Sequence, residues 1–356
     1  MCMGAPTAGW RMRTEFYGDK TEMGRLMSEM IALDGLSKSF GDLVAVDGVT
    51  MSVPRGQVLG FLGPNGAGKS TTMKMIAGFL EPTGGTAKVC GFDVVDQPVE
   101  VKKRIGYLPE GAPTYGDMTA KGFLRFIAQI RGFDGAERDR RIDEVVEKVI
   151  LGEVLSQPIE TLSKGFKRRV GLAQSMLHDP EVLILDEPTD GLDPNQKHHV
   201  RQLIQDMAAD KAIIVSTHIL EEVEAVCSRA VIIAHGRLLA DGTPEDLIAR
   251  APNHNAVVIS VASENAGTAA AAAEALDAVR GVDILDAPDG GARLRVLPKD
   301  AAANSVPLVV PVGEAMKSAD IDVQEIYVER GALDDVFREI TLADDNKNMI
   351  GETAHA

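Results

Sequence analysis

The octapeptide Gly63-Pro64-Asn65-Gly66-Ala67-Gly68-Lys69-Ser70 has the spacing G-x-x-x-x-G-K-S of a phosphate-binding loop. Its glycines let successive backbone N–H groups turn inward and approach phosphate oxygens. A helix expected to begin near Ser70 directs its positive end at the same anion. Lys69 then supplies charge to the β- and γ-phosphates, and the hydroxyl of Ser70 can ligate Mg²⁺. The alternative is a glycine-rich turn with an exposed lysine, but a predicted strand (Val58–Leu62) before the loop and a predicted helix after it favour phosphate binding.

Short apolar runs alternate with helical patterns along residues 31–250. Four runs are rich in β-branched residues, as expected of central strands covered on both faces: Val58–Leu62, Val182–Leu185, Ala212–Ser216 and Ala230–Ile233. Helical patterns lie between and after them, at Thr71–Leu80, Lys164–Leu177, Gln196–Ala209 and Leu220–Cys227. This order predicts an α/β fold with a mainly parallel sheet and helices on both faces. The earlier stretch Ile31–Val53 alternates more and contains Gly41-Asp42 and Asp47-Gly48, so we expect an antiparallel β-subdomain there.

The segment after residue 250 begins with a predicted linker, Ala251–Asn255, and then changes in texture. We expect strands at Val257–Val261, Val282–Leu285, Arg293–Leu297 and Val323–Val328, and helices at Thr268–Arg280, Val312–Ser318 and Leu333–Ile340. The order β-α-β-β-α-β predicts a small ferredoxin-like α+β domain, in which the run Ala269–Ala273 is interpreted as a close-packing helix face. The chain then divides into an extension (1–29), a main domain (30–250), an accessory domain (251–345) and a tail (346–356).

Two carboxylates, Asp186 and Glu187, follow the buried strand Val182–Leu185. Ligands of open α/β sheets bind at the carboxyl ends of the strands. Asp186 is suited to hold Mg²⁺ through water, and Glu187 is suited to act as a general base or to orient the attacking water. The alternative is that both acids only cap the next helix, where negative charge is favourable. Their occurrence beside a phosphate loop favours the catalytic interpretation.

Three further motifs carry a resemblance to a known family. Leu162-Ser163-Lys164-Gly165-Phe166 resembles the signature motif of ABC transporter ATPases, whose commoner form is Leu-Ser-Gly-Gly-Gln. Asp190-Gly191-Leu192-Asp193 is similar to the D-loop of that family, and His218 to its switch histidine. The resemblance covers residues 31–250 in motif order and spacing. It implies a P-loop NTPase fold with an antiparallel β-subdomain and a helical subdomain, ATP hydrolysis, and ATP and Mg²⁺ as cofactors.

The resemblance also implies roles for individual residues. The residues implied to contact nucleotide are Phe40, Gly63, Pro64, Asn65, Gly66, Ala67, Gly68, Lys69, Ser70, Thr71, Ser163, Gly165 and Asp193. Those implied to hold Mg²⁺ are Ser70, Glu110 and Asp186, and those implied in catalysis are Lys69, Glu187 and His218, with His218 tying the γ-phosphate to Glu187. Phe40 either stacks on adenine or packs in a core. Ser163 is also an ordinary helix cap, and the two roles are compatible because a cap leaves N–H groups for a phosphate.

In this family two nucleotide-binding domains hold two ATP molecules between them, head to tail. The resemblance therefore implies that Ser163 and Gly165 of one protomer contact the γ-phosphate bound to Lys69 of the other. The chain contains one phosphate loop and one signature motif, so it requires a second copy or a homologous ATPase. The resemblance further implies an integral membrane permease as partner, docking near Glu110–Thr119, and a location on the cytoplasmic face of the membrane.

Some positions depart from the commonest pattern of the family. Glu110 stands where a glutamine usually ligates Mg²⁺, and Lys164 and Phe166 replace a glycine and a glutamine of the signature. These variants are familiar in a branch that serves exporters and multi-subunit systems. The ending Leu333-Asp334-Asp335-Val336-Phe337 is similar to the Leu-x-Asp-Val-Phe ending of that branch. The substitutions put the ligand role of residue 110 in doubt, but not hydrolysis; the direction inferred is export.

Composition narrows the classes of function. A net charge of −16 argues against broad nucleic-acid binding, because phosphate backbones require a basic surface. The cysteines Cys2, Cys90 and Cys227 have no metal-ligand spacing and are interpreted as reduced thiols. No run reaches the roughly 18 apolar residues of a membrane span. Residues 1–29 are expected to be disordered or to precede the true translation start, at one of Met23, Met27 and Met30.

The sequence distinguishes transport from the other functions of P-loop ATPases. Soluble ABC ATPases of translation carry two cassettes in one chain, and those of DNA repair carry a long coiled coil; this chain has neither. A regulatory ATPase that never couples to a permease remains the main alternative. A P-loop kinase is disfavoured by the signature motif and the D-loop.

Overall fold

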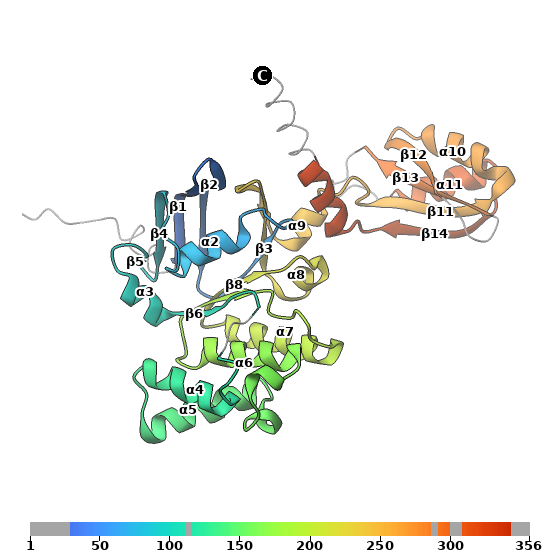
Figure 1. The fold of residues 1–356 in the computed structure, drawn as a ribbon. Coiled ribbons are helices and arrows are strands. Elements are labelled where there is room, and N and C mark those ends of the chain that lie inside the picture. The colour runs from blue at the N-terminus through green and yellow to red at the C-terminus, as the bar shows by residue number, and fades with distance from the viewer. Residues whose placement is uncertain (1–28, 112–114, 286–290, 300–307, 343–356) are drawn as a thin grey trace, which may run out of the picture.

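The computed structural model describes residues 29–111, 115–285, 291–299 and 308–342. An antiparallel sheet in the order β2-β1-β4-β5 opens the chain. It contains β1 (Glu29–Phe40), β2 (Leu43–Pro54), β4 (Gly84–Val89) and β5 (Phe92–Asp93). The predicted antiparallel β-subdomain is confirmed (Figure 1). The first strand includes Glu29, the last residue of the expected extension, whereas residues 1–28 lie outside the described residues.

The dipeptides Gly41-Asp42 and Asp47-Gly48 occupy different places in this sheet. Gly41 and Asp42 form the hairpin loop between the paired residues Phe40 and Leu43. Asp47-Gly48 lies inside β2, where the pairing shifts between Leu36↔Val49 and Lys38↔Val46. The extra residue of β2 is absorbed there as a β-bulge, with Gly48 in the left-handed region at φ 65°.

The central sheet has the order β10-β9-β3-β8-β7-β6. Its strands are β3 (Val58–Leu62), β6 (Ile105–Leu108), β7 (Val182–Asp186), β8 (Ala212–Ser216), β9 (Arg229–Ala234) and β10 (Arg237–Gly242). All pairs are parallel except β9 with β10. The helices of this part of the chain are α2 (Lys69–Ile76), α3 (Pro98–Arg104), α4 (Ala120–Ile130), α5 (Gly135–Lys148), α6 (Lys164–Met176), α7 (Pro194–Ala208), α8 (Leu220–Val226) and α9 (Pro244–Ile248). The predicted parallel sheet is confirmed.

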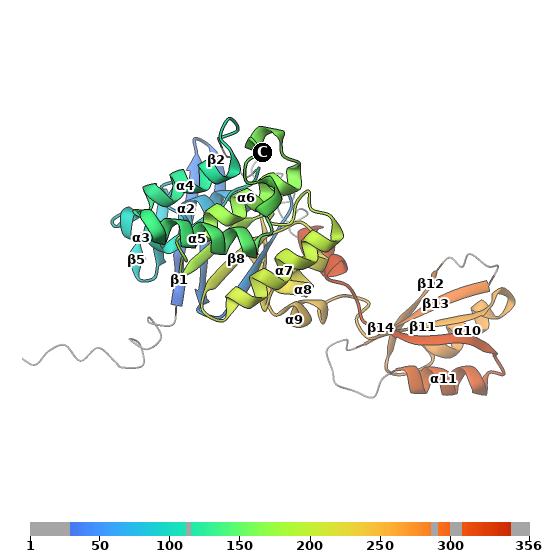
Figure 2. The same cartoon turned by 90° about the horizontal axis from the view of Figure 1, so that it is seen from below.

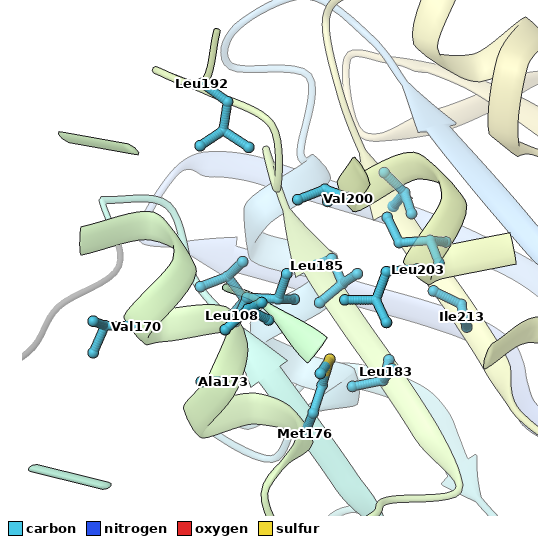
Figure 3. Close-up of a cluster of buried hydrophobic side chains, with 14 of the residues drawn as sticks. Leu108, Val170, Ala173, Met176, Leu183, Leu185, Leu192, Val200, Leu203 and Ile213 are labelled. Carbon is cyan, nitrogen blue, oxygen red and sulfur yellow. The ribbon is translucent and has the colours of Figure 1, made fainter. Parts of the chain in front are cut away.

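Burial of β7 on both faces of the sheet fixes the position of Asp186 and Glu187 at the carboxyl end of this strand. All five residues of β7 are buried. Leu183 and Leu185 pack toward α6 and α7 in one core cluster, with Val170 and Leu203 (Figure 3). Ile184 packs in a second cluster on the other side. A strand covered on both faces cannot shift without exposing this surface, so its carboxyl end is fixed.

The described residues between 256 and 329 form a separate sheet in the order β12-β13-β11-β14, in which each pair of neighbouring strands is antiparallel. Its elements are β11 (Ala256–Ala262), α10 (Ala266–Glu274), β12 (Val279–Leu285), β13 (Gly291–Pro298), α11 (Val309–Ser318) and β14 (Val323–Glu329). The ferredoxin-like order is confirmed. Ala269 and Ala273 are fully buried, as the close-packing interpretation requires. The expected helix to Arg280 was too long, because Val279 and Arg280 already belong to β12, where Val279 pairs with Pro298 and joins the core.

The chain then returns to the main domain. A helix from residue 333, described to residue 342, buries Leu333 in the core cluster of α6 and α7, with Phe337 and Ile340 against it. Figures 1 and 2 show this helix beside α8 and α9, with the β11–β14 sheet extending outward from it. The expected linker 251–255 is also packed: the amide of Asn253 donates to Glu329 and Asp335 at 3.0 and 3.1 Å. Among the described residues, every helix is too short or too polar to cross a membrane. The expected tail 346–356 lies outside the described residues.

Candidate nucleotide site

The phosphate loop leaves β3 and enters α2, and its geometry requires glycine at both ends. A Cβ on Gly63 would lie 2.4 Å from the carbonyl oxygen of Ile233. One on Gly68 would lie 2.5 Å from that of Ala45, and Gly68 also has a φ of 103° as the N-cap of α2. Because no larger side chain fits, these backbones can approach an anion closely. The N–H groups at the start of α2 point into the same loop.

Lys69 is the first residue of α2 and is 8% exposed. Its Nζ donates to the carbonyl oxygens of Gly63 and Pro64 at 2.7 and 3.0 Å, so the ammonium is held inside the loop. Burial lowers the pKa of Lys69, while the charges of Glu187, Asp186 and Glu110 oppose that shift. The lysine therefore lies within electrostatic reach of all three carboxylates.

Asp186 and Glu187 stand at the carboxyl end of β7, as predicted. Asp186 is 3% exposed, and its Oδ1 accepts a hydrogen bond from Ser216. Its Oδ2 is buried and has no hydrogen-bond partner among the described residues. An unpaired buried carboxylate oxygen is costly, and a cation would satisfy it. The hydroxyl of Ser70 and the carboxylate of Asp186 are hard oxygen donors, so they fit Mg²⁺, which usually takes one or two carboxylates together with phosphates.

Glu187 lies opposite His218, which follows β8. Its Oε1 is 2.9 Å from Nδ1 of His218. Burial raises the pKa of the Glu187 carboxyl, and the hydrogen bond and charge of His218 counteract part of that rise. A carboxylate whose pKa is moved toward neutrality is better matched to proton abstraction than an exposed one. The histidine side chain is 65% exposed, so it is accessible to a ligand.

A cavity of about 330 Å³ brings many of these groups together. Its lining includes several predicted site residues: Gly63, Pro64, Asn65, Glu110, Glu187 and His218. Asp186 directly precedes the lining residue Glu187 in the chain, and the rest of the phosphate loop continues from the lining residue Asn65. Ser163 and Gly165 are not among the lining residues, and neither are Phe40 and Asp193.

The signature motif lies elsewhere on the same protomer. Ser163 caps α6, and its Oγ accepts from the N–H of Phe166 at 3.3 Å. Asp193 similarly caps α7, accepting from Gln196 at 2.9 Å. Both caps are exposed. Phe40 is 49% exposed at the end of β1, with Nζ of Lys38 5.3 Å above its ring, so its face is free of core packing.

Sequence reasoning missed several residues that build the site. Arg168, on α6, is 4% exposed and donates to the carbonyl oxygens of Asp186, Glu187 and Pro109. This guanidinium ties the signature helix to the backbone of Asp186 and Glu187. Asp334 and Phe337 of the C-terminal helix line the cavity itself. Their motif was noted in the sequence, but no local signal indicates that it folds back onto this site.

Comparison with known proteins agrees with this geometry. The ABC transporter family profile matches residues 46–190. The probable multidrug ABC transporter ATP-binding protein YbhF of Escherichia coli is 38% identical over 222 residues, which cover 61% of this chain and 38% of YbhF, so the match spans less than half of that relative. The Nod factor export ATP-binding protein I of Ralstonia nicotianae is 36% identical over 220 residues, or 62% of this chain and 68% of that protein.

A solved structure of the ATP-binding subunit of an ABC transporter is 34% identical, with a TM-score of 0.58; the match covers 61% of this chain and 91% of that one. The residues that the family profile matches include the phosphate loop, Asp186 and Glu187. The chain therefore belongs to the ABC transporter ATP-binding proteins, a family of ATPases.

Proposed function

We propose that this chain binds and hydrolyses ATP as a dimer and drives a separate membrane permease in the direction of export. The observation that carries the proposal is the cavity in which the phosphate loop faces the Glu187–His218 pair. Hydrolysis of a terminal phosphate requires donors to the anion and a base in one cavity.

In this proposal each residue of the site has a defined role. The loop amides and Lys69 hold the phosphates, and Glu187 accepts a proton from the attacking water. His218 orients Glu187 and contacts the γ-phosphate. Ser70 and Asp186 would hold Mg²⁺, which neutralises developing phosphate charge when bound. Glu110, exposed on the cavity wall, is the third proposed ligand.

The proposed dimer follows from what one protomer lacks. Its own Ser163 and Gly165 do not line its cavity, so a second copy or a homologous ATPase would bring its signature helix to the nucleotide. The exposed cap of α6 is suited to this because its first N–H groups favour an anion. Phe40 would stack on the adenine.

The proposed permease contact uses an apolar patch defined by Tyr115, Phe126 and Ile130. Tyr115 lies in the expected docking loop, residues 110–119, of which residues 112–114 fall outside the described part. Its ring meets that of Phe126 edge-on at 5.6 Å, and Ile130 is one turn further along α4. Tyr115 is 56% exposed and Ile130 65% exposed. Exposed apolar groups gathered in this way mark an interaction site. The relative that is named for Nod factor export supports export as the direction. In this proposal the permease contact lies on the cytoplasmic face of the membrane.

The ATPase part of the proposal is tested with Lys69→Ala and the matched control Lys74→Ala. Lys74 lies on the same helix but is exposed. Lys69→Ala should lose ATP binding and turnover, measured by fluorescent-nucleotide titration and phosphate release, while Lys74→Ala keeps both. Equal turnover by wild type and Lys69→Ala would refute the phosphate-loop assignment.

The transport part is tested by co-sedimentation with membranes of the native host. Wild type should sediment with these membranes but not with protein-free liposomes. Ile130→Glu should abolish the association, whereas Ile284→Glu, an equally exposed change on β12, should leave it intact. Association of wild type with liposomes alone, or no effect of Ile130→Glu, would contradict the proposed docking patch.

A further inference from the structure

Glu222 is a buried acid on α8, outside the cavity described above. It is 4% exposed. Its Oε1 lies 3.3 Å from Nζ of Lys197 and 3.6 Å from the guanidinium of Arg201, both on α7. A carboxylate removed from water needs such compensation, and even then a buried ion pair is weak evidence of a role in stability. Both of these contacts involve Oε1 and leave the role of Oε2 to be explained.

Oε2 of Glu222 accepts from two buried threonine hydroxyls. Thr189 donates at 2.5 Å and Thr217 at 3.4 Å. Thr189 immediately precedes Asp190, the first residue of the D-loop, and Thr217 immediately precedes His218. One oxygen atom thus joins the loop after β7 to the loop after β8.

These two loops connect different parts of the site. Nζ of Lys164, in the signature motif, lies 2.8 Å from the Asp190 carboxylate. On the other side of Glu222, His218 lies 2.9 Å from Glu187. Contacts and peptide bonds together therefore connect the signature motif to the proposed base, through Asp190, Thr189, Glu222, Thr217 and His218. Small displacements of a catalytic group have large effects on rate.

We infer that Glu222 is a positioning residue that fixes the D-loop and the His218 loop relative to each other. In this role Glu222 keeps His218 in contact with Glu187. It also connects the conformation of the signature motif to that of the His218–Glu187 pair. Glu222 does not reach the cavity itself. The inference rests on the proposed ATPase function, because its measurable consequence is a change in turnover.

The test uses purified Glu222→Gln, which keeps the side chain's shape but removes its charge. We expect kcat to fall by about 10- to 100-fold, with KM for ATP within about twofold, since the phosphate loop is untouched. The matched control is Glu221→Gln, the same change at the exposed neighbouring residue of α8, which should behave as wild type. Thr189→Val should reproduce the loss in kcat, and Thr189→Ser, which retains the hydroxyl, should restore it.

The outcomes separate the inference from the proposed function. Absence of ATP turnover in wild type would reject the proposed function. Turnover in wild type with unchanged kcat in Glu222→Gln and in Thr189→Val would reject the positioning role alone, as would a rise in KM without loss of kcat. If Glu222→Gln does not fold, the two threonine variants decide the question by themselves.

Discussion

At the scale of single residues, Glu187 is held in a backbone conformation that it would rarely adopt alone. Its φ is 53°, in the left-handed region, where residues other than glycine are strained. The N–H of Glu187 donates to the carbonyl of Ser216 at 3.1 Å, and Arg168 binds its carbonyl oxygen. These contacts offset the strain and aim the side chain at His218.

The pKa of Glu187 leads to a prediction about pH. Because a base must be ionised, hydrolysis should fall as the pH drops through this pKa, which burial raises. The His218 contact acts in the opposite direction, so His218→Ala should raise the pKa further and move the acid limb of kcat to higher pH. The measurement is kcat against pH for the variant, for wild type and for His198→Ala, an exposed histidine on α7. An unmoved acid limb in His218→Ala would show that the 2.9 Å contact does not control Glu187.

Residues with a local chemical pattern could be predicted from the sequence, and residues that act through distant contacts could not. Lys69, Asp186 and Glu187 follow from motif spacing and from the strand before each. Arg168 reaches Pro109, 59 positions away, and Glu222 reaches Thr189, 33 positions away. Nothing near either residue in the sequence specifies those partners.

At the scale of elements, α6 carries the proposed contact with the partner's nucleotide at its capped end. Ser163→Ala removes the cap and should destabilise the protein by about 1 kcal/mol. Thr243→Ala, which removes the cap of α9, should have a similar effect on stability. Only Ser163→Ala should also weaken ATP-driven dimerisation. Thermal unfolding and sedimentation velocity with ATP measure the two effects, and equal dimerisation by both variants would reduce Ser163 to a structural cap.

Element types were predictable because burial on both faces, or on one face only, leaves different sequence patterns. The buried runs of β3, β7 and β8 and the alternation of β13 show both cases. The boundaries of the elements were less predictable than their types. The alanine-rich stretch favours helix up to Arg280, but pairing of β12 with β13 ends it earlier because Val279 is buried there.

At the scale of the whole molecule, the C-terminal helix joins the accessory sheet to the main domain. Leu333 is fully buried in the core cluster of α6 and α7. Leu333→Ala should therefore destabilise the main domain by about 2–4 kcal/mol. The control is Leu342→Ala, at a 54% exposed position of the same helix. Urea unfolding followed by ATP-site fluorescence measures the effect, and a change confined to the accessory sheet would contradict this packing.

This return of the chain could not be predicted from sequence. The apolar positions of Leu333, Val336 and Phe337 predict an amphipathic helix, but they do not specify the surface that it covers. The structure places Phe337 and Asp334 on the wall of the nucleotide cavity, so the accessory segment is in direct contact with the proposed site.

In the proposed mechanism two copies of this chain close around ATP, and Glu187 then supports hydrolysis. The most direct measurement is size-exclusion chromatography of Glu187→Gln and wild type with ATP and Mg²⁺, together with phosphate release. The amide keeps the shape of the side chain but cannot accept the proton. We predict that the variant elutes as a stable dimer while hydrolysis collapses. A variant that remains monomeric and hydrolyses ATP at the wild-type rate would contradict both the base assignment and the proposed dimer mechanism.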